Sequence, residues 1–163
     1  MVKLRLPVIF RNLKDTMKLK LSLIAAMFAI ASLSACGGSS SDAPSTPVYS
    51  PAALTKTDVV VGTGATATTG KAVKVHYTGW LYNTTVADFK GAKFDSSAGK
   101  APYPYTVGSA NVIAGFDQGV TGMKVGGKRT VLVPSNLGYG PAGSQNIPPN
   151  SGLVFDLELI EVN

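Results

Sequence analysis

The sequence is 163 residues long, the size of one ordinary domain with an appendage, and its 15 basic and 9 acidic residues give a formal net charge of +6. Six of the basic residues fall within the first twenty positions, and the near-neutral remainder excludes the basic face expected of a nucleic-acid-binding domain. One cysteine and one histidine exclude an internal disulfide framework and a zinc site with three or four nitrogen or sulfur ligands.

Residues 1–35 have the pattern of a secretory signal peptide. Lys18 and Lys20 accompany an apolar core over residues 21–33, which is shorter than the ~20 residues that a membrane-spanning helix needs. Met17 is an alternative start to Met1, because the signal is already complete from that position.

The signal ends in Leu-Ser-Ala before Cys36, which resembles the bacterial lipoprotein signal, whose cysteine is acylated and becomes the new N-terminus. An ordinary secretory signal followed by a chance cysteine is the alternative. A diacylglycerol and a further acyl chain, such as palmitate, suffice for stable anchoring. We therefore expect a lipoprotein attached to the membrane through Cys36. Because Gly37 and not aspartate follows the cysteine, we expect it at the outer membrane of the bacterial cell envelope, on the periplasmic or the surface face.

Residues 36–53 are expected to form the lipidated cysteine and a flexible tether. Serine, proline, glycine, threonine and alanine dominate, so the segment cannot bury enough apolar area to offset the entropy of ordering. A tether of this kind spans ~20–25 Å. It contains no amphipathic helix that could drive dimerisation, so we expect a monomer.

Residues 54–163 are enough to enclose one hydrophobic core, and their alternating apolar residues predict an antiparallel sheet. The strands that we predict are 59–61, 73–78, 103–107, 129–133 and 153–159. Pro102 and Pro104 restrict the third of these to an edge or to pairing on one side. Only residues 112–120 favour a helix. The fold class is therefore α+β, an antiparallel sheet with one short helix against one face.

Conventional catalytic groups are scarce in this domain. A Ser-His-Asp arrangement needs a histidine base, and His76 falls on the outward, polar face of its strand. Gly62 and Gly64 indicate a turn, because no complete phosphate-binding motif follows them. Aromatic residues are frequent near turns, and Tyr139 lies between two glycines in the long loop 137–152, where a ring can contact a ligand.

Six motifs in this part of the chain carry a resemblance. In order they are His76-Tyr-Thr-Gly79, Lys93-Phe-Asp-Ser-Ser97, Val112-Ile-Ala-Gly-Phe-Asp-Gln-Gly119, Gly138-Tyr-Gly140, Ile147-Pro-Pro149 and Leu153-Val-Phe-Asp-Leu-Glu-Leu159. Together they resemble the FKBP-type peptidyl-prolyl cis-trans isomerases over residues 54–163. The resemblance implies a five- or six-stranded antiparallel sheet curled around one short helix, with a shallow apolar pocket between them.

The resemblance also implies site residues. Catalytic roles are implied for Tyr77, Asp95 and Tyr139: Asp95 bonds the Tyr77 hydroxyl or a substrate group, and Tyr139 donates to a substrate carbonyl. The Ile113 N–H is expected to bind another carbonyl. Substrate-binding roles are implied for Phe94, Tyr103, Val112, Ile113, Phe116, Ile147 and Phe155. Phe116 stands where many relatives have tryptophan, so the proline slot is kept but lacks an indole N–H.

The implied reaction breaks no bond, so the resemblance implies no cofactor and no metal. The uncatalysed barrier to rotation about a peptide bond is ~18–20 kcal/mol. The twisted amide has a smaller dipole than the planar amide, so an apolar pocket favours the transition state over the ground state.

Three departures from the family pattern bear on specificity. About seven extra residues lie between Gly79 and Phe94, roughly at 83–91, and Ser144 falls near a position where histidine is common. Lys100 is the nearest candidate for an arginine that the family often carries.

We expect a prolyl isomerase that assists the folding of exported or envelope proteins. Its partners are proline-containing polypeptides, with rapamycin-like macrolides as inhibitors. The alternative is a proline-peptide-binding or chaperone-like envelope module with little turnover.

Overall fold

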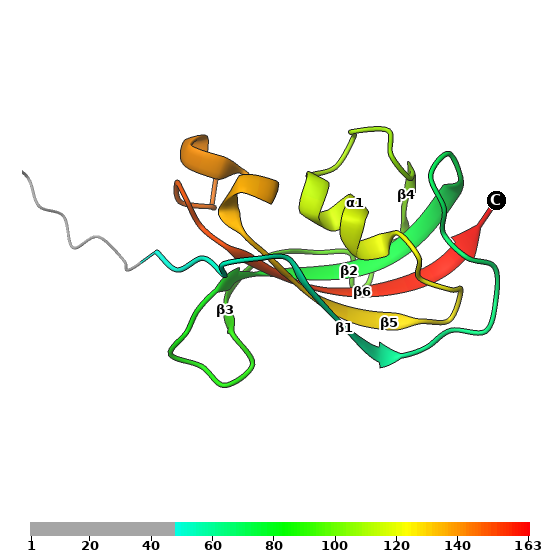
Figure 1. Ribbon diagram of the computed structural model, residues 1–163, viewed down its shortest axis with the longest axis horizontal. Coiled ribbons are helices and arrows are strands. Elements are labelled where there is room, and N and C mark those ends of the chain that lie inside the picture. Colours follow the sequence, from blue (N-terminus) through cyan, green and yellow to red (C-terminus); the bar gives the residue numbers. More distant parts are fainter. Residues whose placement is uncertain (1–47) are drawn as a thin grey trace, which may run out of the picture. The chain divides into compact units, whose positions relative to one another are not determined.

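Residues 48–163, the part of the chain that the computed structural model describes, form a sheet of six antiparallel strands (Figure 1). The strands are β1 (Thr55–Val60), β2 (Ala72–Tyr82), β3 (Lys90–Ser96), β4 (Tyr103–Thr106), β5 (Lys128–Val133) and β6 (Leu153–Val162). They follow the order β1-β5-β6-β2-β3, and β4 pairs with the first part of β2. The expected α+β class and antiparallel sheet are confirmed. The predicted signal peptide, Cys36 and most of the predicted tether lie outside the described residues.

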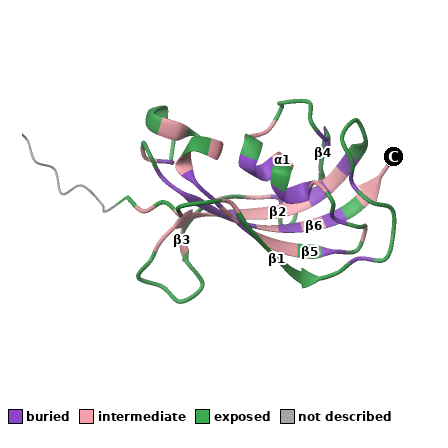
Figure 2. Cartoon of the chain, viewed as in Figure 1, coloured by how far each residue is buried: buried purple, intermediate pink, exposed green. Residues whose placement is uncertain are grey.

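The core lies on one face of the sheet, where alternation along β6 places its leucines. Leu153, Leu157 and Leu159 are buried in one cluster with valines from β2 and β5, among them Val75 and Val131. Figure 2 shows buried stretches along β5 and β6. Each such side chain contributes about 1.5–3 kcal/mol through removal of apolar surface from water. Hydrophobic alternation therefore fixes which face of the sheet packs inward.

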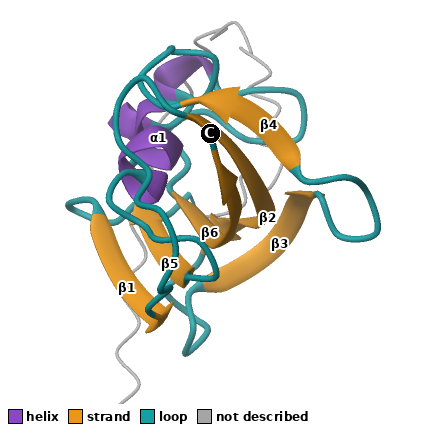
Figure 3. Cartoon of the chain, turned by 90° about the vertical axis from the view of Figure 1, so that its right-hand side faces the viewer, coloured by secondary structure: helices purple, strands orange, loops and turns teal. Residues whose placement is uncertain are grey.

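One short helix, α1 (Ala114–Val120), covers this face (Figure 3). The helix can pack closely on the sheet because Gly115 and Gly119 have no side chains. A Cβ added at Gly115 would lie 2.2 Å from Val133 Cγ1, and one added at Gly119 would lie 3.0 Å from Val131 Cγ2. The helix begins after Ile113, two residues later than the pattern predicts, because Ile113 is extended with φ −60° and ψ 147°.

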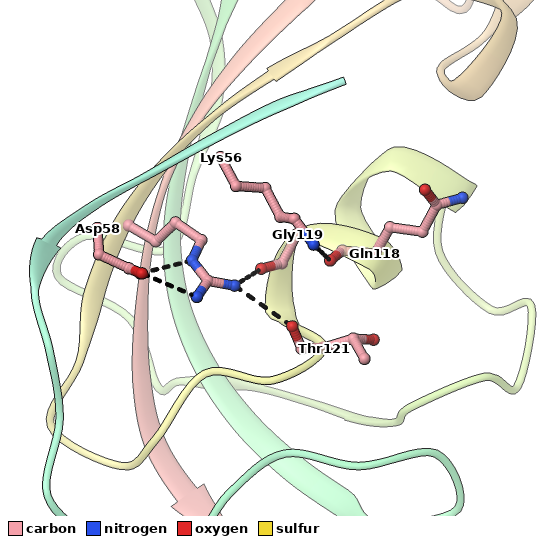
Figure 4. A network of polar contacts seen from close by, with 6 residues as sticks. Lys56, Asp58, Gln118, Gly119 and Thr121 are labelled. Carbon is pink, nitrogen blue, oxygen red and sulfur yellow. Dashed lines mark hydrogen bonds and ion pairs between the residues drawn. The ribbon is translucent and has the colours of Figure 1, made fainter. Parts of the chain in front are cut away.

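A cationic side chain from the sheet holds the C-terminal end of α1 (Figure 4). Arg129 of β5 donates from Nη1 to the carbonyl oxygens of Gly119 (2.8 Å) and Thr121 (3.3 Å). It also donates from Nε to Asp58 Oδ1 of β1 at 2.7 Å, and this hydrogen bond lowers the pKa of the Asp58 carboxyl. Positive charge complements the free carbonyls that end a helix. The arginine thereby ties β1 and β5 to the helix.

Two strands differ from the sequence-based expectation. Strand β1 begins at Thr55 and not at Val59, and all six of its residues are exposed. It is an edge strand that pairs with β5 through its backbone, so it shows no buried alternation. Strand β3 was not predicted at all. The predicted edge character of residues 103–107 is confirmed, because β4 pairs only with β2.

The end of the predicted tether differs as well. Residues 48–53 lie in the described part of the chain, and Tyr49 and Ser50 are hydrogen-bonded to the domain. The folded unit therefore begins before Leu54. Within residues 48–163, no helix combines the length and the apolar character needed to cross a membrane.

Candidate active site

A cavity of about 430 Å³ opens between the sheet and the beginning of α1. Strands β2, β3, β4 and β6 contribute to it, together with α1 and the loops before α1 and after β5. Its lining residues are Tyr77, Phe94, Asp95, Tyr103, Ala110, Asn111, Val112, Ile113, Phe116, Tyr139 and Phe155. The structure thus gathers every predicted site residue here except Cys36, which lies outside the described residues, and Ile147.

The floor and walls of the cavity are aromatic. Phe116 is 4% exposed and meets three rings edge to face: Tyr77 at 5.6 Å, Phe155 at 5.4 Å and Tyr105 at 5.8 Å between centroids. Tyr103 packs edge to face on Tyr77 at 6.2 Å. Pairs of this kind contribute about 0.5–1.5 kcal/mol beyond their buried area. Interlocked rings give the cavity a firm apolar surface that could receive a proline ring.

One wall depends on a glycine in the facing strand. Phe94 of β3 lies edge to face on Phe155 of β6, with centroids 5.7 Å apart. Between them, on β2, a Cβ added at Gly79 would stand 2.5 Å from Phe94 Cζ and 3.0 Å from Phe155 Cε1. The Phe94 ring can therefore cross the strand only because residue 79 has no side chain.

The mouth of the cavity is polar. The Tyr77 hydroxyl donates to Asp95 Oδ2 at 2.5 Å, while Asp95 Oδ1 accepts the Ser96 N–H at 2.7 Å. Burial, reinforced by the hydrogen bond to Asp95, raises the pKa of Tyr77 above the usual tyrosine value. Burial and the nearby Asp95 charge also raise the pKa of Tyr139, a residue that is 37% exposed. Both phenols therefore remain hydrogen-bond donors through the neutral range.

Two lining residues were missed by the sequence reasoning. Ala110 and Asn111 precede the predicted helical segment and form part of the rim. Ala110 has φ 58°, a left-handed conformation, in the turn that follows Gly108. The Asp117 carboxylate accepts the Gly108 N–H at 2.9 Å, which ties this turn to α1. The run Gly-Ser-Ala-Asn at residues 108–111 is typical of a turn, but composition alone does not indicate its contact with the cavity.

Ile147 lies in an adjoining recess and does not line the main cavity. This recess has a volume of about 300 Å³ and shares Phe94, Asp95 and Tyr139 with the cavity. Its remaining lining residues are Ser144, Gln145, Asn146 and Ile147. The turn Ser144–Ile147 thus places Ile147 beside the cavity, and its predicted contact with the substrate stays a prediction. None of residues 83–91, where the extra residues were predicted, lines either space.

A larger depression, of about 570 Å³, lies on the outer face of the sheet. His76 lines it, as the alternation of its strand predicts. Four of its charged residues form ion pairs within it: Lys90 pairs with Asp156 at 2.7 Å and Lys128 with Glu158 at 3.2 Å. A surface of paired charges is less suited to a proline ring than the aromatic cavity.

Comparison with known proteins agrees with this geometry. The model of a family described as FKBP-type peptidyl-prolyl cis-trans isomerase matches residues 64–160. The FK506-binding protein of Neisseria meningitidis serogroup A is 46% identical over 107 residues, which make up 64% of this chain and 92% of that protein. FK506-binding protein 1B of Neurospora crassa is 45% identical over 101 residues, 61% of this chain and 89% of that protein.

Solved structures give the same result for the fold. The crystal structure of AtFKBP13 matches with a TM-score of 0.58 and 38% identity, over 70% of this chain and 96% of that chain. FkpA from Escherichia coli matches with a TM-score of 0.57 and 36% identity, over 71% of this chain and 51% of that chain.

Proposed function

This chain belongs to the FKBP-type peptidyl-prolyl cis-trans isomerases, and on that premise we propose that the aromatic cavity is its isomerase site, with Tyr77, Asp95 and Tyr139 acting on the substrate. The reaction is rotation about an Xaa-Pro peptide bond, which takes tens to hundreds of seconds without a catalyst. One observation carries the proposal: the hydrogen-bonded pair of Tyr77 and Asp95 lies at the mouth of a cavity whose floor is the buried ring of Phe116.

The apolar floor supplies the first part of catalysis. The planar amide of the ground state has a larger dipole than the twisted amide of the transition state. Moving the peptide bond from water to the rings of Phe116 and Phe155 therefore destabilises the planar form more. Interactions that differ between the two states are the ones that lower the barrier.

The polar mouth supplies the second part. The Tyr139 hydroxyl donates to a carbonyl of the substrate, and the backbone N–H of Ile113 donates to another carbonyl. These contacts hold the flanking residues while the Xaa-Pro bond rotates. The Tyr77–Asp95 pair keeps a carboxylate at the rim, where it can accept a hydrogen bond from the substrate backbone. No proton is transferred and no covalent bond is broken.

A peptide assay tests this assignment. We expect the full chain, purified in detergent, to accelerate cis-to-trans isomerisation of a short Xaa-Pro peptide. Tyr139→Phe and Asp95→Ala should each lower kcat/KM about tenfold, which corresponds to ~1.4 kcal/mol or one hydrogen bond.

Matched variants outside the cavity serve as controls. Tyr82 stacks on Phe89 at 5.2 Å, and Asp88 lies in the inserted loop, so Tyr82→Phe and Asp88→Ala should leave kcat/KM unchanged. Equal losses in the control and site variants would contradict the assignment.

We further propose that the enzyme is a lipoprotein of the bacterial outer membrane that acts on exported proteins. The signal-like residues 1–35 and the position of Cys36 support this proposal. Cys36→Ala should abolish incorporation of labelled palmitate and release the protein from the membrane fraction. Recovery of both forms in the same membrane fraction would contradict lipid anchoring. Digestion of intact cells with protease separates a surface location from a periplasmic one.

Macrolide inhibition and a monomeric state complete the proposal. A rapamycin-like macrolide places an apolar ring in the aromatic cavity and should compete with the peptide. Titration of the peptide reaction with rapamycin measures this competition. Sedimentation in detergent should give the mass of one chain.

A further inference from the structure

We propose that residues 49–51 form a strap that fixes both ends of the loop carrying Tyr139, and that Ser50 is a positioning residue for the isomerase site. We call residues 134–152 the site loop, because they contribute Tyr139 to the cavity and Ile147 to the adjoining recess. The proposal rests on the proposed function of that site.

The strap binds the two ends of the site loop through neighbouring residues. At the start of the loop, the Ser135 N–H donates to Ser50 Oγ at 3.0 Å. At its end, the Gly152 N–H donates to the Tyr49 carbonyl at 2.8 Å. Two adjacent residues thus hold two loop positions that are far apart in the chain.

The contact at the end of the loop is close as well as hydrogen-bonded. A Cβ added at Gly152 would lie 2.4 Å from Pro51 Cδ and 2.7 Å from Ser50 Cα, so the strap crosses the glycine with no room for a side chain. Pro51 fixes its own φ and restricts Ser50 to an extended conformation. The strap is therefore set in the shape that reaches both ends.

The site loop has little regular structure of its own to hold Tyr139. It contains two single-turn 3-10 helices, Ser135–Leu137 and Gly140–Ala142, with Tyr139 between them. The Asn150 N–H donates to the Gly140 carbonyl at 2.8 Å inside the loop. Ser135 is the first residue of the turn that leads into Tyr139, so its bond to Ser50 sets the direction in which the loop leaves β5.

A small displacement at this point matters for catalysis. Misplacing a group that orients the substrate by about 1 Å can lower the rate up to ~10²-fold. Ser50 touches neither the cavity nor the recess, so its effect must pass through the loop. The strap is also continuous with the predicted tether, which places the attachment of the domain next to the catalytic loop.

The test replaces Ser50 in the full chain. Ser50→Ala removes the acceptor of the Ser135 N–H and should lower kcat/KM for an Xaa-Pro peptide about three- to tenfold, the effect of one hydrogen bond. Ser50→Thr keeps the hydroxyl and should restore the wild-type value. Thr84→Ala, an exposed hydroxyl in the inserted loop, is the matched control and should have no effect.

A second readout separates positioning from general destabilisation. Amide hydrogen exchange in residues 135–150 should accelerate about three- to tenfold in Ser50→Ala, whereas exchange in β5 and β6 should stay at the wild-type rate. In a Tyr139→Phe background, Ser50→Ala should cost less than it does alone, because the group that it positions is already gone.

Unchanged loop exchange in Ser50→Ala, or a loss of kcat/KM that is equally large with and without the Tyr139 hydroxyl, would overturn the proposal. If Tyr139→Phe alone retains full turnover, the assignment of Tyr139 in the proposed function fails. The exchange measurement still decides whether the strap holds the loop.

Discussion

Replacing Gly79 with alanine should disable the isomerase site without unfolding the protein. The new Cβ would lie 2.5 Å from Phe94 Cζ and 2.9 Å from Phe94 Cε2. Non-bonded carbon atoms prefer about 3.5–4.0 Å, so the ring must move by about 1 Å. Overpacking of this kind costs about 1–3 kcal/mol. Because Phe94 is half-buried and can swing outward, we expect a loss of stability near 1 kcal/mol.

The effect on activity should be larger than the effect on stability. Phe94 is a wall of the cavity, and a shift of about 1 Å in a group that positions the substrate can cost up to ~10²-fold in rate. We expect Gly79→Ala to lower kcat/KM between ten- and a hundredfold. Peptide kinetics and urea unfolding of the same full-length protein separate the two effects.

A double-mutant cycle identifies the cause. In a Phe94→Ala background, the methyl group at residue 79 keeps its contact with Phe155 Cε1, at 3.0 Å, and a shift of a few tenths of an ångström relieves that contact. Gly79→Ala should then lower kcat/KM by no more than about twofold. Wild-type activity in Gly79→Ala, or a loss of kcat/KM that is the same with and without the Phe94 ring, would contradict this prediction.

Arg129→Met should lower the free energy of unfolding, measured in urea, by about 2–4 kcal/mol, because two carbonyls at the end of α1 lose a charged donor. Asp58→Asn, which removes only the exposed ion pair, should lower it by at most about 1 kcal/mol. Equal losses in the two variants would show that the bonds to the helix contribute no more than the ion pair. The pKa of Asp58 is lowered in the folded state, so the carboxylate stabilises the fold above the unfolded pKa of 3.8, and this stabilisation is lost as the pH falls through the lower folded pKa. The free energies of unfolding of wild type and Asp58→Asn should therefore converge in acid. A difference that stays constant with pH would argue against the ion pair. Activity should be flat from pH 6 to about 9 because the pKa values of Tyr77 and Tyr139 are raised, and an inflection near pH 8 in a kcat/KM profile would show that one of them ionises. We also propose that the recess beside Tyr139 receives the side chain of the residue before proline. Asn146→Leu, which makes this recess less polar, should then raise kcat/KM for Leu-Pro peptides relative to Gln-Pro peptides by about three- to tenfold. An unchanged ratio would exclude the recess as that site.

Regular alternation of apolar and polar residues made the central strands predictable. Strands β1 and β3 lack this alternation, so β1 was predicted only in part and β3 was not predicted. Leu153, Leu157 and Leu159 share one face of β6, so the strand and its buried face could be predicted together. Strand β3 reads Lys-Gly-Ala-Lys-Phe-Asp-Ser and forms because β2 offers it a paired edge. Strand β1 likewise depends on its partner β5, since none of its residues is buried.

The position of most site residues followed from the motifs, but contacts between distant segments did not. Ile147 could be assigned to the neighbourhood of the site, yet its recess depends on the fold of the turn from Ser144. Ser50 lies in a polar segment whose composition indicates a tether. Its partner, the Ser135 N–H, lies 85 residues further along the chain, and the composition of residues 48–53 does not predict this hydrogen bond.

The most direct test of the central claim is the rate of exchange between the cis and trans forms of an Xaa-Pro peptide at equilibrium, measured by NMR exchange spectroscopy with a small molar fraction of the full chain. We expect exchange to accelerate in both directions in proportion to the protein added, while the cis fraction of the peptide stays constant. We also expect Tyr139→Phe and Gly79→Ala to weaken this acceleration. No acceleration, or a cis fraction that changes in step with the protein concentration, would contradict the account and indicate a protein that holds proline peptides without turning them over.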